Sequence, residues 1–268
     1  MIDRKMQARQ QYGYLSKIIA EIRNDHPTLS CRAMYYKILP EKLGRDAFEQ
    51  LCKELGYQTA KSVNKRRTTD SSGVIRFANL LEGLTLVKPD QAWASDITYF
   101  EVGSRYYYIT FVMDCYSRLI LGYSVSQRLV TEQTTLAALK MAIATRGGKV
   151  QKDIIIHSDG GGQYYDKDFL KFTQLHQMRN SMCEYAYENG KAERLNGTIK
   201  NNYLIHFDIK CYADLIKGVD RVIPLYNKER PHKSLNYVSP LMFENKFLTL
   251  QQQTMPTMTE SFDAKSCF

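Results

Sequence analysis

Residues 93–125 read WASDITYFEVGSRYYYITFVMDCYSRLILGYSV. The stretch is rich in β-branched and aromatic residues, which favour strands, and short polar turns interrupt it in two places. We therefore expect three strands, over residues 97–102, 105–113 and 119–125. Because the connections between them are short, the strands should pair as an antiparallel meander.

Helical and strand patterns alternate after this meander. The sequence predicts a buried strand at 153–157 and helices over 131–146 (capped by Thr131), 166–175, 189–203 and 215–223. Three strands followed by alternating helices and strands are typical of an α/β fold, a mixed sheet flanked by helices.

The residues ahead of the meander predict short helices. Apolar residues recur at helical spacing over 14–24, and a second helix is capped by Thr28 or Ser30 and ended by Pro40. A third helix is expected over 44–55. Helices joined by short turns are typical of a helix-turn-helix, although other helical hairpins share the pattern.

These patterns divide the chain into four parts. We expect a helical DNA-binding region at 1–60, a basic linker at 61–89, a catalytic core with C-terminal helices at 90–246 and a polar tail at 247–268. The boundaries follow changes in composition, since the linker and the tail contain little that can be buried.

Positive charge is concentrated at the front of the chain. The net charge is +9, and residues 1–80 hold 15 lysines and arginines against 8 aspartates and glutamates. Such an excess favours nucleic-acid binding, but an ordinary basic surface explains it equally well. Lys65, Arg66 and Arg67 in the linker are candidates to follow DNA phosphates or to enter a minor groove; a merely solvated linker is the alternative.

The composition excludes several classes of protein. The chain has 268 residues, of which 44% are apolar and 24% charged, as in globular proteins. No apolar run is long enough to span a membrane, and the polar N-terminus does not resemble a secretory signal. The six cysteines form no CxxC pair, so we expect no disulfide framework or cysteine-rich zinc site, and a cytoplasmic location.

Three carboxylates stand where a site would be expected. Asp96 lies inside the first strand, Asp159 follows the buried strand just before three glycines, and Glu193 lies on the helix at 189–203. Oxygen ligands of this kind suit Mg²⁺ or Mn²⁺, and a pair of such ions catalyses phosphoryl transfer. On position alone, a turn at Asp159 and a solvated helix face at Glu193 remain alternatives.

Four motifs carry a resemblance to a known family. They read WASDITY (93–99), HSDGGGQY (157–164), ENGKAERLNGTIK (188–200) and YNKERPHKSL (226–235). Together they resemble the DDE core of insertion-sequence transposases and retroviral-type integrases, and most closely the orfB-type bacterial transposase. The resemblance implies a ribonuclease-H-like five-stranded mixed sheet, two Mg²⁺ or Mn²⁺ ions, and Asp96, Asp159 and Glu193 as their ligands.

The motif that carries Glu193 also contains a rival glutamate, Glu188. Glu193 is preferred because Arg194 follows it and Lys200 comes seven residues later, as in the family motif. Seven residues are close to two helical turns, so Lys200 shares a face with Glu193 and is expected to contact a DNA phosphate.

The resemblance also assigns partners and a reaction. Arg194, Gln163 and Tyr164 join Lys200 as expected DNA contacts. The implied function is a DNA transposase that binds the terminal inverted repeats of its element and catalyses metal-dependent strand cleavage and transfer into target DNA. A homo-oligomer on DNA, with an upstream orfA product as a possible partner, is expected in the bacterial cytoplasm near the nucleoid. The alternatives are an integrase or ribonuclease-H-type nuclease on the same core, or a DNA-binding regulator that has lost activity.

Overall fold

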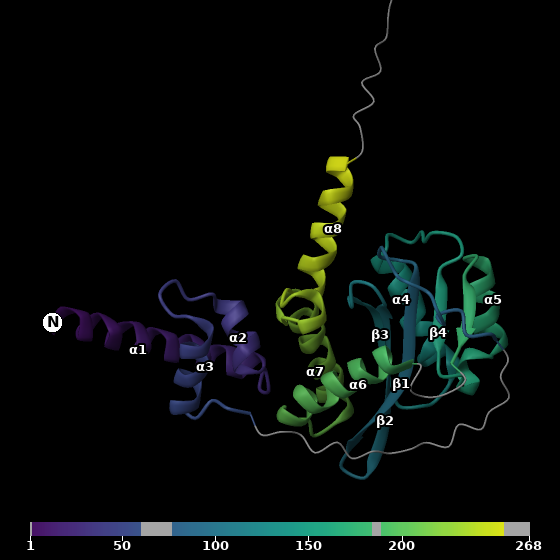
Figure 1. Cartoon of the computed structure of the whole chain (residues 1–268). Coiled ribbons are helices and arrows are strands. Elements are labelled where there is room, and N and C mark those ends of the chain that lie inside the picture. The colour runs from purple at the N-terminus through teal and green to yellow at the C-terminus, as the bar shows by residue number, and fades with distance from the viewer. Residues whose placement is uncertain (1, 60–76, 184–188, 255–268) are drawn as a thin grey trace, which may run out of the picture.

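A mixed five-stranded sheet forms the centre of the larger part of the molecule (Figure 1). The computed structural model describes residues 2–59, 77–183 and 189–254. The strands are β1 (Ala92–Val102), β2 (Arg105–Asp114), β3 (Ile120–Ser126), β4 (Ile155–Ser158) and β5 (Arg179–Met182), in the order β3-β2-β1-β4-β5. β1, β2 and β3 pair antiparallel, whereas β4 runs parallel to both β1 and β5. The predicted α/β class and antiparallel meander are therefore confirmed.

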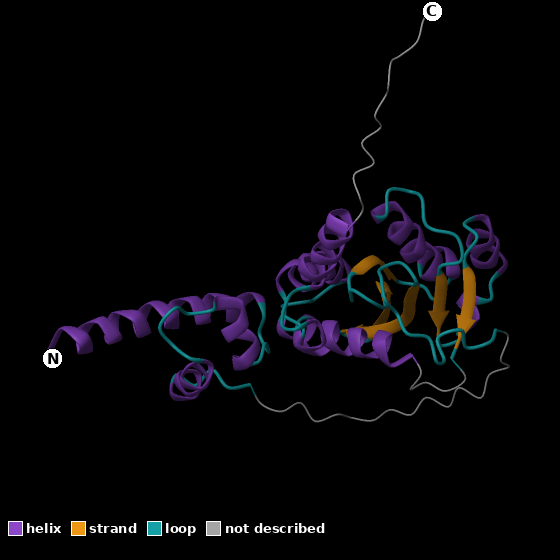
Figure 2. Ribbon diagram, turned by 45° about the horizontal axis from the view of Figure 1, so that its top comes forward, coloured by secondary structure: helices purple, strands orange, loops and turns teal. Residues whose placement is uncertain are grey.

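Helices cover both faces of this sheet (Figure 2). One layer contains α4 (Thr135–Thr145) and α5 (Lys167–Leu175), and the other contains α6 (Gly190–Asn202) and α7 (Tyr212–Pro224). Trp93 is fully buried in the α4 layer, while Phe100 of the same strand packs in the α6 layer. Because side chains alternate along a strand, Asp96 shares the α6 face with Phe100.

A smaller helical module precedes the sheet and lies beside it (Figure 1). It contains α1 (Ile2–Asp25), α2 (Cys31–Ile38) and α3 (Arg45–Glu54), which pack around a separate apolar cluster. Ser30 caps α2, since its Oγ accepts a hydrogen bond of 3.2 Å from the Ala33 N–H. The helix predicted over 14–24 is part of the longer α1.

Three further segments differ from the sequence-based boundaries. Thr131 opens a 3₁₀ turn rather than capping α4, which begins at Thr135. The last helix, α8 (Pro240–Thr254), includes residues 247–254 of the predicted tail, because its aromatic side chains pack on Tyr116. Part of the predicted linker packs as well, since leucines at 80, 81 and 86 join an apolar cluster with residues of the central strands β1 and β4. Within the described ranges, no helix has the length and apolar character needed to cross a bilayer.

Candidate active site

Asp96 lies in the middle of β1, on the face that α6 covers. Its carboxylate is half-buried, and its Oδ2 accepts a hydrogen bond of 2.7 Å from Nδ2 of Asn196 on α6. The preceding residue, Ser95, points to the opposite face, where its hydroxyl is 2.8 Å from the hydroxyl of Tyr164. Strand alternation thus directs Asp96 toward α6 and holds it there.

Asp159 enters the same region from the end of β4. The parallel pairing of β4 with β1 sets His157 opposite Ala94, so the residues that follow β4 emerge near Asp96. The Gly161 N–H donates a hydrogen bond of 3.1 Å to Oδ1 of Asp159, which fixes the carboxylate. Gly160 has a φ of 80°, and a Cβ there would collide with the Met182 side chain, so this turn requires glycine.

Glu193 comes from the first turn of α6 and is exposed. It shares one face of the helix with Asn196 and Lys200, at positions i, i+3 and i+7. Asn196 contacts Asp96, and Lys200 Nζ donates a hydrogen bond of 3.2 Å to Thr98 Oγ1, two residues farther along the same strand face. This face of α6 therefore runs along β1, with Glu193 near Asp96.

The three carboxylates interact electrostatically. Burial raises the pKa of Asp96 to about 8, and the negative charge of Asp159 adds to the rise. Glu193 also raises this pKa, while the hydrogen bond from Asn196 opposes the shift. Asp159 keeps solvent-accessible surface, but the protein atoms around its carboxyl desolvate it and raise its pKa too. A half-buried, desolvated acid with two like charges nearby favours a cation at this place.

The carboxylates are neighbours, but they do not form a closed ligand set. Among the residues that the structure describes, no three histidine, cysteine, aspartate or glutamate side chains lie close enough together to hold a metal ion. The rival Glu188 lies outside the described residues.

The structure places the expected DNA-contacting residues in different environments. Tyr164 is 3% exposed and its hydroxyl pairs with Ser95, so the expectation that it contacts DNA is wrong: its ring belongs to the α4 layer. Gln163 is half-buried, and Arg194 is exposed on α6. The Lys65–Arg67 segment lies outside the described residues.

Asn196 is a residue of this site that the sequence motifs did not single out. Its hydrogen bond to Asp96 joins α6 to β1 directly. A signal was present, because Asn196 comes three residues after Glu193 and therefore lies on the same helix face. Asn189 acts similarly at the start of α6, where its Nδ2 donates to the Ser95 carbonyl oxygen at 3.2 Å.

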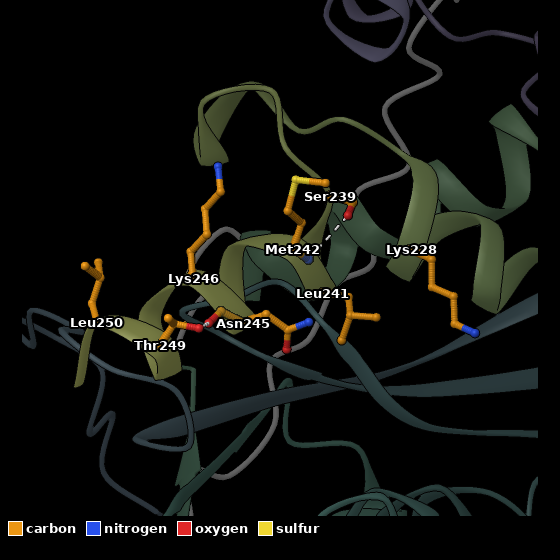
Figure 3. Close-up of a pocket in the computed structure, with 8 residues that line it drawn as sticks. All are labelled: Lys228, Ser239, Leu241, Met242, Asn245, Lys246, Thr249 and Leu250. Carbon is orange, nitrogen blue, oxygen red and sulfur yellow. Dashed lines mark hydrogen bonds between the residues drawn. The ribbon is translucent and has the colours of Figure 1, made fainter. Parts of the chain in front are cut away.

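A hollow of about 640 Å³ follows α8 (Figure 3). Leu241, Met242 and Leu250 give it apolar walls, and its ionic side chains are two lysines. None of the three carboxylates lines it. The acidic cluster on β1, β4 and α6 is thus the better candidate for phosphoryl chemistry.

Comparisons with known proteins agree with this architecture. The integrase core domain family matches residues 87–187, and a second integrase core domain family matches residues 177–240. The 31 kDa protein of insertion element IS600 from Shigella sonnei is 30% identical over 210 residues, which are 76% of either chain. Transposase InsF of insertion sequence IS3A from Escherichia coli (strain K12) is 33% identical over 164 residues.

The InsF match covers 60% of this chain and 56% of that transposase. Among solved structures, the simian T-cell lymphotropic virus intasome in complex with PP2A regulatory subunit B56 gamma has the same fold. The TM-score is 0.51 at 17% identity, over 76% of this chain and 65% of that chain. The chain therefore belongs to the insertion-sequence transposases with an integrase core domain, a family of DNA transposition and integration, and its fold is ribonuclease-H-like.

Proposed function

We propose that this chain cleaves DNA strands at the ends of its element and joins the freed ends to target DNA, with Asp96, Asp159 and Glu193 as metal-binding carboxylates. One observation carries the proposal: Asp96 is half-buried against α6, and its pKa is raised by desolvation and by both other carboxylates. Such like-charge crowding costs stability and is typical of functional sites.

The donor set fits Mg²⁺ or Mn²⁺. Carboxylate oxygens are the ligands that these hard cations prefer, and a cation would remove the repulsion that raises the pKa of Asp96. Asp96 and Asp159 are held by hydrogen bonds, whereas Glu193 is exposed and has room to turn toward them. When bound, the ions activate the attacking oxygen and stabilise the leaving oxygen of the phosphodiester.

The surrounding residues position the reactants. Asn196 orients the Asp96 carboxylate, and the Gly161 N–H orients that of Asp159. Lys200 lies on the β1 side of α6, with its Nζ 4.8 Å from the centre of the Tyr99 ring. From this place its ammonium binds a DNA phosphate beside the carboxylates, a role that its cationic, donor-only head group suits.

The test is a set of isosteric variants assayed on DNA that carries the ends of the element. Asp96→Asn, Asp159→Asn and Glu193→Gln should each abolish strand cleavage and strand transfer in Mg²⁺ while a mobility-shift assay shows unchanged DNA binding. Asp168→Asn, on the exposed start of α5, is the matched control and should cleave normally.

Two outcomes would overturn parts of this assignment. Normal cleavage by the Asp96 or Asp159 variant would refute the catalytic role and favour a DNA-binding regulator. Loss of cleavage in Glu188→Gln, with normal cleavage in Glu193→Gln, would identify Glu188 instead of Glu193 as the third metal-binding carboxylate.

The reaction also needs both ends of the element at once. We propose a homo-oligomer assembled on the terminal inverted repeats in the bacterial cytoplasm, because two ends must reach one target together. An upstream orfA product is a further proposed partner. Light scattering of the chain with end DNA, with and without that product, distinguishes a self-sufficient oligomer from a mixed assembly.

A further inference from the structure

A small cavity of about 60 Å³ lies on the other side of α6 from the carboxylates. Lys191, Arg194 and Thr198 line it from α6, at positions i, i+3 and i+7. At 100° per residue this row is opposite the row of Glu193 and Lys200. The remaining walls come from the β2–β3 turn, which supplies Arg118, and from the closing YNKERPHKSL motif.

Three cationic side chains meet in this cavity. Arg118, Lys191 and Arg194 form no ion pair with a carboxylate among the described parts of the chain. Lys191 donates one hydrogen bond, to the Cys115 carbonyl oxygen at 3.3 Å. Burial lowers the pKa of Lys191, and the charge of Arg118 adds to this shift while the Asp114 carboxylate opposes it. An anion between the three cations would reduce their repulsion.

The turn that carries Arg118 is rigid. The buried Asp114 carboxylate accepts hydrogen bonds from the Tyr116 and Ser117 N–H groups at 2.9 and 2.6 Å, and another from the Asp90 N–H at 2.7 Å. Arg118 has a φ of 65°, and its N–H donates to the Asp114 carbonyl oxygen at 3.0 Å. Asp114 is therefore held by donors of its own turn and of Asp90, and the backbone position of Arg118 is fixed before any ligand arrives.

The closing motif is only partly explained by packing. Asn227 bonds the backbone of Ile120 at 2.9 and 2.8 Å, and Arg230 bonds the Tyr203 hydroxyl at 3.2 Å. His232 lines the cavity beside the Tyr226 ring, and its buried Nε2 has no hydrogen-bond partner in the described chain. A buried ring nitrogen without a partner is costly, so a hydrogen-bonding ligand in the cavity would stabilise it.

Gly197 gives an independent indication of a ligand. It lies inside α6, where glycine is a poor helix former, yet a Cβ there would meet only Asn201 Nδ2, at 3.9 Å. Among the residues that the structure describes, no packing contact requires this glycine. It lies on the outer surface of α6, between the row that contains Glu193 and the row that lines the cavity. The missing side chain allows another backbone to approach closely.

We propose that Arg118, Lys191 and Arg194, with His232, bind one phosphate of a DNA backbone that crosses α6 at Gly197. The phosphate lies on the far side of α6 from the carboxylates, so the protein contacts DNA on both sides of the helix that carries Glu193. The inference rests on the proposed function only in naming DNA as the source of the phosphate.

The first test measures the salt dependence of DNA binding in EDTA, so that cleavage plays no part. Arg118→Gln and Lys191→Gln should each weaken binding to a random-sequence duplex about tenfold at low salt. Each should also lower the slope of log K against log salt, by at most about 0.9, the value for the one phosphate that the three cations share. Arg179→Gln removes the same charge from the exposed start of β5, at the opposite end of the sheet, and should change neither quantity.

The second test uses Gly197→Ala, which separates binding from folding. This variant should raise the melting temperature, because alanine is the better helix former, and should nevertheless weaken DNA binding. Unchanged affinity in Gly197→Ala, together with unchanged salt slopes in Arg118→Gln and Lys191→Gln, overturns the proposal. Because Gly197→Ala should be more stable than the wild type, misfolding cannot account for its result.

A third arm distinguishes DNA phosphate from a free anion. Inorganic phosphate is titrated into the protein while the His232 ring signals are followed by NMR, and duplex DNA is then added. If DNA reverses the phosphate-induced shifts of His232, DNA and phosphate share the site, which supports the proposal. If the shifts stay unchanged when DNA is added, the cavity binds free phosphate, which overturns it. The Asp96, Asp159 and Glu193 variants should keep the wild-type salt slope, so failure here and failure of the catalytic proposal are distinguishable.

Discussion

The helical module and the integrase core are each built around apolar side chains, but the surface where they meet is polar. The module packs Ile19, Met34 and Phe48 in a cluster of its own, separate from the clusters on the two faces of the sheet. The interface between them consists mainly of polar and aromatic contacts. They are hydrogen bonds or ion pairs from His26 to Tyr203 (2.8 Å), Lys37 to Glu229 (3.0 Å) and Arg221 to Asp25 (2.9 Å), and a stack of Tyr36 on Tyr237 with ring centres 4.2 Å apart.

This difference predicts a hierarchy of stabilities. Burial of large apolar side chains stabilises each interior by several kcal/mol, whereas an exposed ion pair contributes about 1 kcal/mol or less. The module should therefore leave the core more easily than either part unfolds. Such an interface lets the module separate from the core while both parts stay folded.

The largest effect is expected inside the core, at Gly122 on β3. A Cβ at this position would collide with the backbone of α4, at the Ala138 carbonyl and at Ala142. Backbone atoms cannot rotate away, so Gly122→Ala should lower the free energy of unfolding by about 3 kcal/mol or more. Trp93, the single tryptophan, is buried in the same layer and reports the urea transition by fluorescence.

Gly162→Ala is the control, because a Cβ there meets nothing within 4 Å. Equal urea midpoints for the two variants would show that β3 and α4 can separate at little cost.

Phe48→Ala tests the interior of the module. Phe48 is fully buried in the module cluster, and its truncation should lower the stability of the module by about 3 kcal/mol. Hydrogen exchange should then accelerate in α2 and α3 while the Trp93 transition keeps its wild-type midpoint. A parallel shift of the Trp93 transition would show instead that the two parts unfold as one unit.

Much of the core was predictable because its signals are local. The β-branched run of β2, the continuous apolar segment of β4 and the helical stripes of α6 and α7 identify their own secondary structure. The positions of Asp96 and Asp159 followed from these elements, since strand ends and strand faces are fixed by periodicity.

The remaining features depend on contacts between distant residues. β5 reads Arg-Asn-Ser-Met and is a strand through its pairing with β4, not through its own propensity. The first turns of α8 are attached to the core by the Glu244 contact with Arg146, 98 residues away in sequence. The burial of Tyr164 likewise follows from its contact with Ser95 on β1, which no local pattern reveals.

Glu244→Gln tests the polar attachment of α8. Arg146 binds both carboxylate oxygens of Glu244, whose side chain is 4% exposed, and also contacts Asp90 at 3.0 Å. The variant removes the charge but leaves Asp90, so the loss should be about 2 kcal/mol, as for a hydrogen bond to a charged group. Faster hydrogen exchange in α8 measures it, and Glu132→Gln, an exposed acid, is the control. Unchanged exchange in α8 would mean that its aromatic contacts with Tyr116 hold it alone.

The smallest effect is expected where the module meets the core, at His26. Burial lowers the pKa of His26 from 6.5 to about 4, and the positive charge of Lys37 lowers it further, against the opposing charge of Glu229. The ring is therefore neutral in the docked module, and its Nδ1 contact with the Tyr203 hydroxyl does not depend on a proton from solution. Above pH 6.5 the ring is neutral whether docked or free, so docking keeps its full stability. As the pH falls from 6.5 toward 4, the undocked module binds a proton that the docked module does not, and docking weakens.

The loss of docking free energy should reach about 1 kcal/mol near pH 5.5, measured by fluorescence energy transfer between a dye on α3 and a dye on α7. His26→Gln should remove the dependence on pH over this range, and a variant that keeps the wild-type profile would assign the dependence to another group.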